Sequence, residues 1–325
     1  MGLCCYLGCL ESLVFAVGFV FLLRWTYFLF NTIYRIYFGT QVTTERYGKD
    51  SWAVVTGSTD GIGKGLALEL ASRGFNLVLI SRTIEKLNAV AIEAQEAAKK
   101  AGKSIHTRVI AFDFSDDTSV QAYQGIKDKI KDLDISILVN NVGYTHQVDR
   151  STKIFFDETT VNCYPIVLLT QQVVSLMTGR KGKKSLIINF SSQAALSPTP
   201  GFSSYSATKV FDWYFSNAIA HELRRNDVDV LSVLPGMVAT PLTGRKVADI
   251  KEVVITPKQC ADGVLGNATS GMTHGGAAHE VTAYFSRILV DLIPINLFYR
   301  MADSIGKQLQ QQFVKLQKAD KQKQK

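Results

Sequence analysis

From Trp52 onward, short apolar runs alternate with longer segments that have the periodicity of a helix. This alternation is typical of βαβ units and therefore of a parallel sheet. The runs are apolar almost throughout, as at residues 53–55 and 135–139, which is expected for strands that helices cover on both faces. The sequence therefore predicts an α/β fold with a doubly wound parallel sheet of the Rossmann type.

The alternation defines six strands and six helices, with weaker evidence for a seventh strand at residues 277–281. The strands are expected at residues 52–56, 76–81, 107–113, 135–140, 185–191 and 229–234. The helices are expected at residues 63–72, 84–101, 119–130, 158–177, 204–225 and 257–270. Residues 281–301 are apolar again and contain Pro294. They are expected either to form a bent helix at an apolar substrate entrance or at a bilayer, or to pack on the core.

The first forty residues differ from the rest of the chain. Residues 4–38 are almost unbroken apolar and aromatic sequence, interrupted only by Glu11, Arg24, Asn31 and Arg35. The run is long enough for a membrane helix, and it lacks the basic start and the small-residue cleavage site of a signal peptide. The alternative is a hairpin or a helix lying on the membrane, with the two arginines on its polar face. Positive charge follows the run, which predicts a cytosolic catalytic part.

Composition excludes several classes of function. The net charge of +8 owes much to lysines in the last stretch of the chain, so nucleic acid is not expected as a partner. The five cysteines form no C-x-x-C pair, and the five histidines have no ligand spacing, so neither a metal site nor a disulfide framework is expected. Lys321 and Lys323 resemble a dilysine signal for the endoplasmic reticulum; the alternative is an ordinary basic tail.

We therefore divide the chain into four parts. Residues 1–40 are expected to be a membrane anchor, and residues 41–275 a dinucleotide-binding catalytic domain. Residues 276–306 are expected to form an apolar segment at the substrate lip or the membrane, and residues 307–325 a basic tail.

A glycine-rich turn follows the first predicted strand and leads directly into a helix. Such a turn places a helix N-terminus beside the carboxyl end of the strand, where free N–H groups and the helix dipole bind a pyrophosphate. It is not the phosphate loop of nucleotide triphosphatases, because Ser58 replaces the first glycine of that motif and Gly65 follows Lys64. The residues expected at the cofactor are Gly57, Ser58, Thr59, Asp60, Gly61, Ile62 and Gly63.

The second strand ends in Ser81 and Arg82, where a fold that binds NAD would carry an acidic residue for the ribose 2'-hydroxyl. A guanidinium at this place can pair with a 2'-phosphate, which a carboxylate would repel. The sequence thus favours NADP(H) as cofactor, with both residues in contact with it. The alternative is that Arg82 only ends the strand in solvent.

Tyr205 and Lys209 lie four residues apart in a predicted helix and therefore on one face of it. A phenol is a poor proton carrier at neutral pH, and a nearby ammonium favours its phenolate form. The pair stands thirteen residues after Ser192, beyond a strand whose carboxyl end should border the ligand crevice. This arrangement predicts a proton donor at the end of the sheet.

With these residues in view, residues 52–271 resemble the short-chain dehydrogenase/reductase superfamily. The glycine turn, the Asn140-Asn141-x-Gly143 segment, the serine, the Tyr-Lys pair and Pro235-Gly236 occur in the order of that family. The resemblance implies a sheet of about seven strands and a catalytic tetrad of Asn162, Ser192, Tyr205 and Lys209. It also implies that Asp113 faces the adenine. The other cofactor contacts that it implies are Asn140, Asn141, Gly143, Tyr205, Lys209, Pro235, Gly236, Val238 and Thr240.

Within that superfamily, the apolar leader and residues 52–64 and 138–143 are similar to the membrane-bound very-long-chain 3-oxoacyl-CoA reductases and 17-beta-hydroxysteroid dehydrogenases. The resemblance implies hydride transfer from NADPH to the ketone of a lipid-like substrate, with Tyr205 as proton donor and Ser192 at the developing alkoxide. It further implies that Lys209 tunes the tyrosine and holds the ribose, and that Asn162 orders a water. Residues 144–161 are short for this branch, so the substrate lip is expected to differ.

The leading expectation is reduction of a 3-oxoacyl-CoA in fatty-acid elongation. The alternatives are a steroid or retinoid dehydrogenase with the same tetrad and, from another class, a membrane scaffold without activity. The expected partners are the membrane, an acyl-CoA or steroid substrate, a second copy of the chain and other elongation enzymes. The expected location is the endoplasmic reticulum membrane, with the catalytic domain in the cytosol.

Overall fold

The computed structural model describes residues 2–145, 152–180, 182–244, 253–294, 296–297 and 300. In them, seven parallel strands form one sheet in the order β3-β2-β1-β4-β5-β6-β7. Their bounds are β1 (Trp52–Thr56), β2 (Asn76–Ser81), β3 (Thr107–Ala111), β4 (Ile135–Asn140), β5 (Ser185–Phe190), β6 (Val228–Val233) and β7 (Met272–Thr273). The order reverses between β1 and β4, and such a switch point is where open α/β sheets bind ligands. The predicted doubly wound fold is confirmed.

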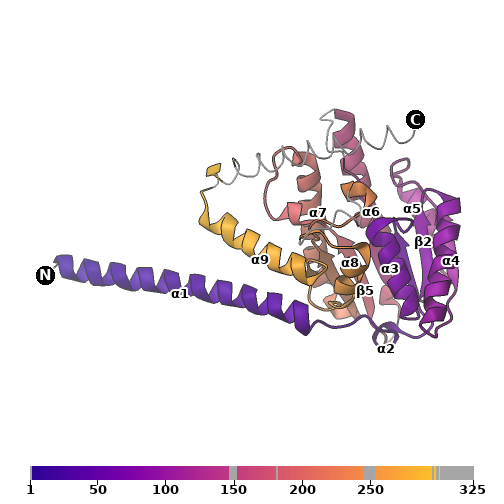
Figure 1. The fold of residues 1–325 in the computed structure, drawn as a ribbon, viewed down its shortest axis with the longest axis horizontal. Coiled ribbons are helices and arrows are strands. Elements are labelled where there is room, and N and C mark those ends of the chain that lie inside the picture. Colours follow the sequence, from indigo (N-terminus) through magenta and orange to yellow (C-terminus); the bar gives the residue numbers. More distant parts are fainter. Residues whose placement is uncertain are drawn as a thin grey trace.

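Helices cover both faces of the sheet (Figure 1). The alternation within β1 shows this, because Ala53 and Val55 belong to one apolar core and Val54 to the other. One core is closed by α3 (Gly61–Ser72), α4 (Ile84–Lys100) and α8 (Pro257–Leu265). The other is closed by α5 (Val120–Asp128), α6 (Thr152–Thr178) and α7 (Ser203–Leu223).

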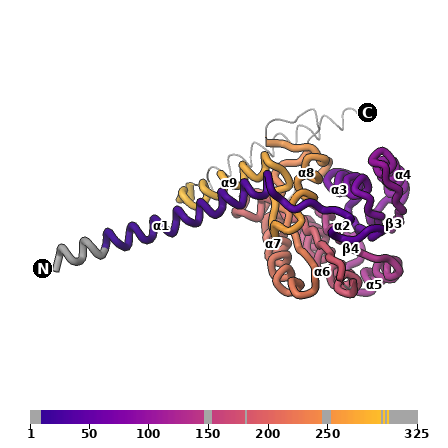
Figure 2. The backbone as a smooth tube through the Cα atoms, turned by 90° about the horizontal axis from the view of Figure 1, so that it is seen from below, coloured from indigo at the N-terminus to yellow at the C-terminus, as the bar shows by residue number. Residues whose placement is uncertain are grey.

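A long N-terminal helix, α1 (Gly2–Tyr37), projects from this body (Figures 1 and 2). Its segment Leu10–Tyr37 is long and apolar enough to cross a membrane, and none of that segment's most apolar window is buried. A second helix, α9 (Ala277–Leu292), leaves the body beside α1 and runs back along it (Figure 2). The expected N-terminal apolar helix is thus present, and a second helix, α9, lies beside it.

The residues that directly follow α1 are hydrogen-bonded to the body of the protein. The Thr40 carbonyl accepts from the Ala268 N–H at 2.8 Å, and the Val42 N–H donates to Leu265 O at 2.7 Å. A β-carbon on Gly39 would lie 2.3 Å from the Gly266 carbonyl oxygen, so only glycine allows this close approach. The short α2 (Thr44–Tyr47) follows, with Tyr47 buried. No flexible linker therefore separates α1 from the sheet.

Several predicted elements differ from the structure. The expected strand at residues 277–281 is wrong: these residues begin α9, and the seventh strand is Met272–Thr273. The segment beginning at residue 281 belongs to α9, which ends at Leu292, before Pro294. Helix α6 begins at Thr152, six residues before the predicted start, and β3 ends at Ala111 rather than at residue 113. The dilysine tail lies outside the described residues.

Candidate active site

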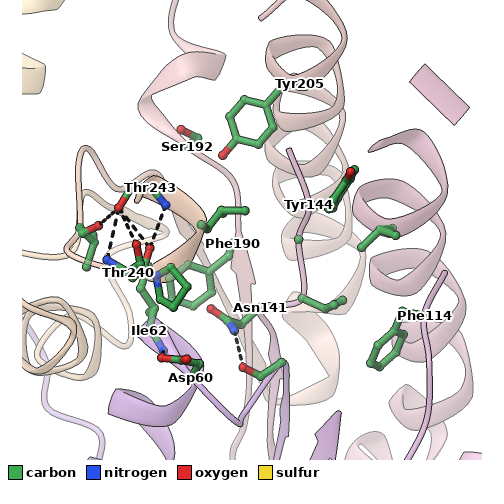
Figure 3. Close-up of a pocket in the computed structure, with 18 of the residues that line it drawn as sticks. Asp60, Ile62, Phe114, Asn141, Tyr144, Phe190, Ser192, Tyr205, Thr240 and Thr243 are labelled. Atoms are coloured by element: carbon green, nitrogen blue, oxygen red, sulfur yellow. Dashed lines mark hydrogen bonds between the residues drawn. The ribbon is translucent and has the colours of Figure 1, made fainter. Parts of the chain in front are cut away.

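A cleft of about 700 Å³ opens at the carboxyl ends of the central strands (Figure 3). It lies beside the switch point between β1 and β4. The cofactor residues predicted from sequence that line it are Gly57, Asp60, Gly61, Ile62, Ser81, Arg82, Asp113, Asn141, Gly143, Tyr205, Lys209, Pro235, Gly236, Val238 and Thr240. Ser192 lines it as well.

The glycine turn has the shape that a pyrophosphate requires. Gly57 and Gly61 have φ of +61° and +55°, in the left-handed region that favours glycine. A β-carbon on Gly63 would lie 2.2 Å from the Gly57 carbonyl oxygen, so helix α3 packs against the turn only because this residue is glycine. Asp60 begins the helix, and its Oδ1 accepts from the Gly61 N–H at 2.7 Å. The turn and the N-terminus of α3 fit a dinucleotide phosphate.

Other members of the predicted cofactor set support the turn from behind. Ser58 is fully buried, and the Thr59 hydroxyl lies 3.0 Å from the Ser81 hydroxyl. Neither Ser58 nor Thr59 lines the cleft, and neither does Gly63. Asn141 donates from Nδ2 to the Thr56 carbonyl at 3.1 Å, which joins the end of β4 to the start of the turn.

Asn140 is the clearest departure from the sequence-based site. It is buried, and its Nδ2 donates to Thr170 Oγ1 at 3.0 Å and to Asn189 Oδ1 at 2.9 Å. Because Thr170 belongs to α6, the side chain of Asn140 points to the face of the sheet that α6 covers. It links β4 to β5 and α6, and it does not line the cleft.

Beyond the carboxyl ends of β2 and β3, Arg82 and Asp113 face each other across the cleft. Arg82 Nη1 lies 3.9 Å from Asp113 Oδ2, and the arginine side chain is 72% exposed. Asp113 is oriented by Ser115, whose N–H and Oγ donate to its Oδ1 at 2.9 and 2.6 Å. The guanidinium therefore borders the cleft and is open to solvent.

Tyr205 and Ser192 lie together at the other end of the cleft, and Figure 3 shows the tyrosine hydroxyl turned toward the serine. Ser192 precedes the short 3-10 helix η1 (Gln193–Ala195), and its Oγ accepts from the Ala194 N–H at 3.2 Å. Tyr205 is in the first turn of α7, and the Lys209 Nζ lies 5.8 Å from the centroid of its ring. The helix thus carries phenol and ammonium on one face toward the cleft.

Lys209 is buried, and its charge is held by two partners. The Nζ donates to the Phe190 carbonyl at 3.1 Å and forms an ion pair of 2.9 Å with Asp212 Oδ2. Burial lowers the pKa of Lys209, but Asp212 and Tyr205 outweigh it, so its pKa is raised. Burial raises the pKa of Asp212 to about 6, against the opposing effect of Lys209. Each charge of the pair thus favours the charged form of the other against the cost of burial.

Asn162 is held by the protein on both sides of its amide. Its Oδ1 accepts from the Tyr144 N–H at 2.7 Å, and its Nδ2 donates to Tyr144 O at 3.0 Å and to Thr208 Oγ1 at 2.9 Å. The asparagine thereby fixes the loop after β4 against α7. A β-carbon on Gly143 would lie 3.6 Å from both Asn162 Oδ1 and Lys209 Nζ, so two members of the predicted tetrad lie beside this glycine.

Several residues at the site were not among those predicted from the sequence. Lys153, Asp157 and Val161 line the cleft from α6, and their spacing of four residues places them on one helical face. Lys153 and Asp157 were missed because the helix was expected to begin only at Glu158. Asp212 was missed too, although an acidic residue three positions after a lysine in a helix is a recognisable ion-pair signal. The remaining unpredicted residues of the lining are Phe114, Ser115, Val142, Tyr144, Phe190, Ser191, Pro241, Leu242 and Thr243.

Comparison with known proteins agrees with this geometry. The profile of the family described as short chain dehydrogenase matches residues 51–251. A very-long-chain 3-oxoacyl-CoA reductase of Coccidioides immitis is 34% identical over 305 residues, which cover 88% of this chain and 85% of the relative. The human 17-beta-hydroxysteroid dehydrogenase type 3 is 38% identical over 257 residues, which cover 76% of this chain and 77% of the relative.

Solved structures share the fold. A 3-ketoacyl-(acyl-carrier-protein) reductase from Brucella melitensis in complex with NADH is 25% identical, with a TM-score of 0.58 over 70% of this chain and 95% of the other. A dehydrogenase from Sphingobium yanoikuyae in complex with NADPH is 23% identical, with a TM-score of 0.59 over 75% of this chain and 96% of the other. Both contain a nicotinamide cofactor, one of each type.

Proposed function

The chain belongs to the short chain dehydrogenase family, and from this premise we propose that it is an NADP(H)-dependent ketone reductase that acts on a very-long-chain 3-oxoacyl-CoA. The observation that carries the proposal is the meeting of Tyr205, Ser192 and Lys209 at one end of a cleft that has a glycine turn at the other. A membrane scaffold would have no physical need for a buried ammonium beside this phenol.

The reaction that we propose divides the work among these side chains. NADPH, when bound in this cleft, would supply a hydride for the carbonyl carbon of the substrate. Tyr205 donates its phenolic proton to the carbonyl oxygen, while the Ser192 hydroxyl hydrogen-bonds the same oxygen. Negative charge develops there only in the transition state, so these two donors stabilise the transition state more than the bound ketone.

Lys209 and Asn162 support this pair. The ammonium of Lys209 favours loss of the tyrosine proton. We propose that it would also hold the nicotinamide ribose by a hydrogen bond. Asn162 holds the loop at Tyr144 against α7, which fixes the wall of the cleft. Its ordering of a water that returns a proton to Tyr205 stays a prediction.

The choice of NADP(H) is supported by Arg82. It is an exposed guanidinium at the cleft, where no carboxylate from the end of β2 would repel a 2'-phosphate. The choice of an acyl-CoA over a steroid is supported by the fungal reductase, whose similarity covers 88% of this chain against 76% for the human steroid enzyme. The steroid dehydrogenase remains the second candidate, because its identity is higher over the shared part.

Purified full-length protein, assayed by the loss of NADPH absorbance with a 3-oxoacyl-CoA and with a keto-steroid, tests the function. We expect the acyl-CoA to be reduced faster, and NADH to support less activity than NADPH. Tyr205→Phe should lower kcat by roughly 10²–10⁴-fold, the usual contribution of a positioned proton donor, with NADPH binding retained. Tyr214→Phe, an exposed tyrosine on the same helix, is the matched control and should stay active. Near-normal turnover by Tyr205→Phe would show that the assignment is wrong.

We propose further that α1 anchors the chain in the endoplasmic reticulum membrane, with the catalytic domain in the cytosol. The division at residues 40, 275 and 306 belongs to this proposal, as do a homodimer and association with other elongation enzymes. Protease added to intact microsomes should digest the domain if it is cytosolic. Protection of the domain until detergent is added would reverse the topology.

A further inference from the structure

The two arginines that interrupt the apolar sequence of α1 both form ion pairs with α9. Arg24 Nη2 lies 3.2 Å from Asp291 Oδ2, and Arg35 Nε lies 2.8 Å from Glu280 Oε2. Each pair of like-charged residues is eleven positions apart on its own helix. Eleven residues are about three helical turns, so each pair occupies one face. The two helices are therefore matched, antiparallel, at both ends of their contact.

Aromatic residues fill the contact between the two ion pairs. The Arg287 guanidinium carbon lies 4.6 Å from the centroid of the Phe28 ring, and that of Arg24 lies 5.5 Å from the same centroid. Trp25 meets Tyr284 edge to face, with centroids 6.1 Å apart. The polar and aromatic side of α9 thus faces α1 along most of its length.

The first turn of α9, where Arg35 of α1 pairs with Glu280, is also bound to the catalytic body. Glu280 is buried, and its Oε1 accepts from Thr273 Oγ1 at 2.8 Å and from the His274 N–H at 2.7 Å. One residue earlier, His279 Nδ1 accepts from the Gly236 N–H at 3.2 Å, and Gly236 lines the cleft. The first turn of α9 is therefore fixed to the edge of the sheet and to the cleft.

The outward face of α9 is apolar. Val281, Phe285, Leu289 and Leu292 are all exposed, and spacings of four, four and three residues place them in one stripe. An amphipathic helix of a water-soluble domain turns its apolar stripe inward and its charges outward. Helix α9 does the reverse, since its charged residues face α1 and its stripe faces away from the protein.

We propose that α9 is a membrane-embedded helix, whose stripe contacts the acyl chains of the leaflet on the side of the catalytic domain. Continuity with α1 identifies lipid as the partner: the most apolar window of Leu10–Tyr37 is entirely unburied, so the two helices present one apolar surface. Trp25 and Tyr284 are residues that favour the membrane interface. The ion pairs to α9 reduce the cost of bringing Arg24 and Arg35 toward lipid. The inference rests on the proposed anchor, not on the reaction.

Site-specific fluorescence in the full-length chain tests this. An environment-sensitive probe is attached at Leu289→Cys, or at Phe285→Cys as a second site, with the native cysteines replaced. Vesicles contain lipids brominated near the carboxyl end of their acyl chains. We expect the bromolipid to quench most of the emission at both sites. A probe at Ile92→Cys, on the exposed face of α4, should keep its emission.

Equal emission with and without bromolipid at residues 285 and 289 would overturn the proposal. A blue-shifted emission that bromolipid does not quench would overturn it too, because it would assign the stripe to a second copy of the chain. Asp291→Arg faces Arg24 with a like charge, so it should reduce the quenching at residue 289. The double variant Arg24→Asp/Asp291→Arg should restore it. Reductase activity, measured on the same preparations, reports separately on the proposed function.

Discussion

Removing one member of the buried ion pair between Lys209 and Asp212 should destabilise the protein strongly, because the other charge would remain unpaired in the core. Both side chains are less than a tenth exposed, and 2.9 Å separates Nζ from Oδ2. Asp212→Leu would leave the ammonium in the core with the Phe190 carbonyl, but no carboxylate, to accept its hydrogen bonds. Breaking a buried pair in this way costs about 3–5 kcal/mol, so we expect the free energy of unfolding to fall by about that amount.

The double variant Lys209→Met/Asp212→Leu separates the pair from its members. Replacing a whole buried ion pair by apolar residues of similar volume is often neutral or stabilising, so most of the loss should be regained, although the double variant would be inactive. Asp212→Asn keeps a hydrogen-bond acceptor near Lys209 and should lose less than Asp212→Leu. The matched control, Asp128→Leu, removes an acid from an exposed pair with Lys131 and should cost at most about 1 kcal/mol.

Urea unfolding in detergent, followed by tryptophan fluorescence, measures these differences. The buffer should be at about pH 8, well above the Asp212 pKa of about 6, so that the carboxylate is ionised. A loss below about 1 kcal/mol for Asp212→Leu, the value of a solvent-exposed pair, would refute the reasoning. So would a double variant that is no more stable than the worse of the two single variants.

Three other predictions concern the cofactor and acid stability. Arg82→Ala should raise the KM for NADPH roughly tenfold, as for loss of a charged hydrogen bond, and leave that for NADH unchanged, whereas the exposed Arg225→Ala should change neither. Gly63→Ala should cost about 1–3 kcal/mol and weaken NADPH binding in a titration, because its β-carbon would lie 2.2 Å from the Gly57 carbonyl oxygen; unchanged binding and stability would contradict this. Burial lowers the pKa of His274 from its ordinary 6.5, so its contribution to stability is complete above pH 6.5 and is lost as the pH falls below it. Between about pH 7.5 and about pH 5.5, this loss should lower the urea concentration at the unfolding midpoint more in the unmodified protein than in His274→Asn.

Sequence patterns predicted the sheet well, because its central strands are apolar on both faces and helices with clear periods separate them. The last strand was misplaced because Met272–Thr273 has only two residues, too few for a period, whereas the apolar start of α9 resembles a strand. Helix α6 was begun too late, and the cleft residues on its first turns were lost with it.

The site could be predicted from the sequence where it depends on the order and spacing of residues. It could not be predicted where it depends on the direction in which a side chain points. The spacing of Tyr205 and Lys209 fixes a shared helical face, which the structure reproduces. The family resemblance placed Asn140 at the cofactor, but its side chain points into the core. The ion pairs of Arg24 and Arg35 could not be predicted, because each joins residues about 250 positions apart in the sequence. The equal spacing of the two arginines and of their two partners can be seen in the sequence once the pairs are known.

The hydrogen bonds of Thr40 and Val42 to the body, together with the close approach of Gly39 to Gly266, join α1 to the catalytic domain without a flexible linker. A domain on a long flexible tether would tumble and sample substrate from any direction. Here the direction of α1 determines the direction in which the cleft opens. With the proposed anchor in place, every copy of the enzyme would hold its cleft at the same height and tilt. An apolar substrate would then approach the cleft from one direction, which the fold determines.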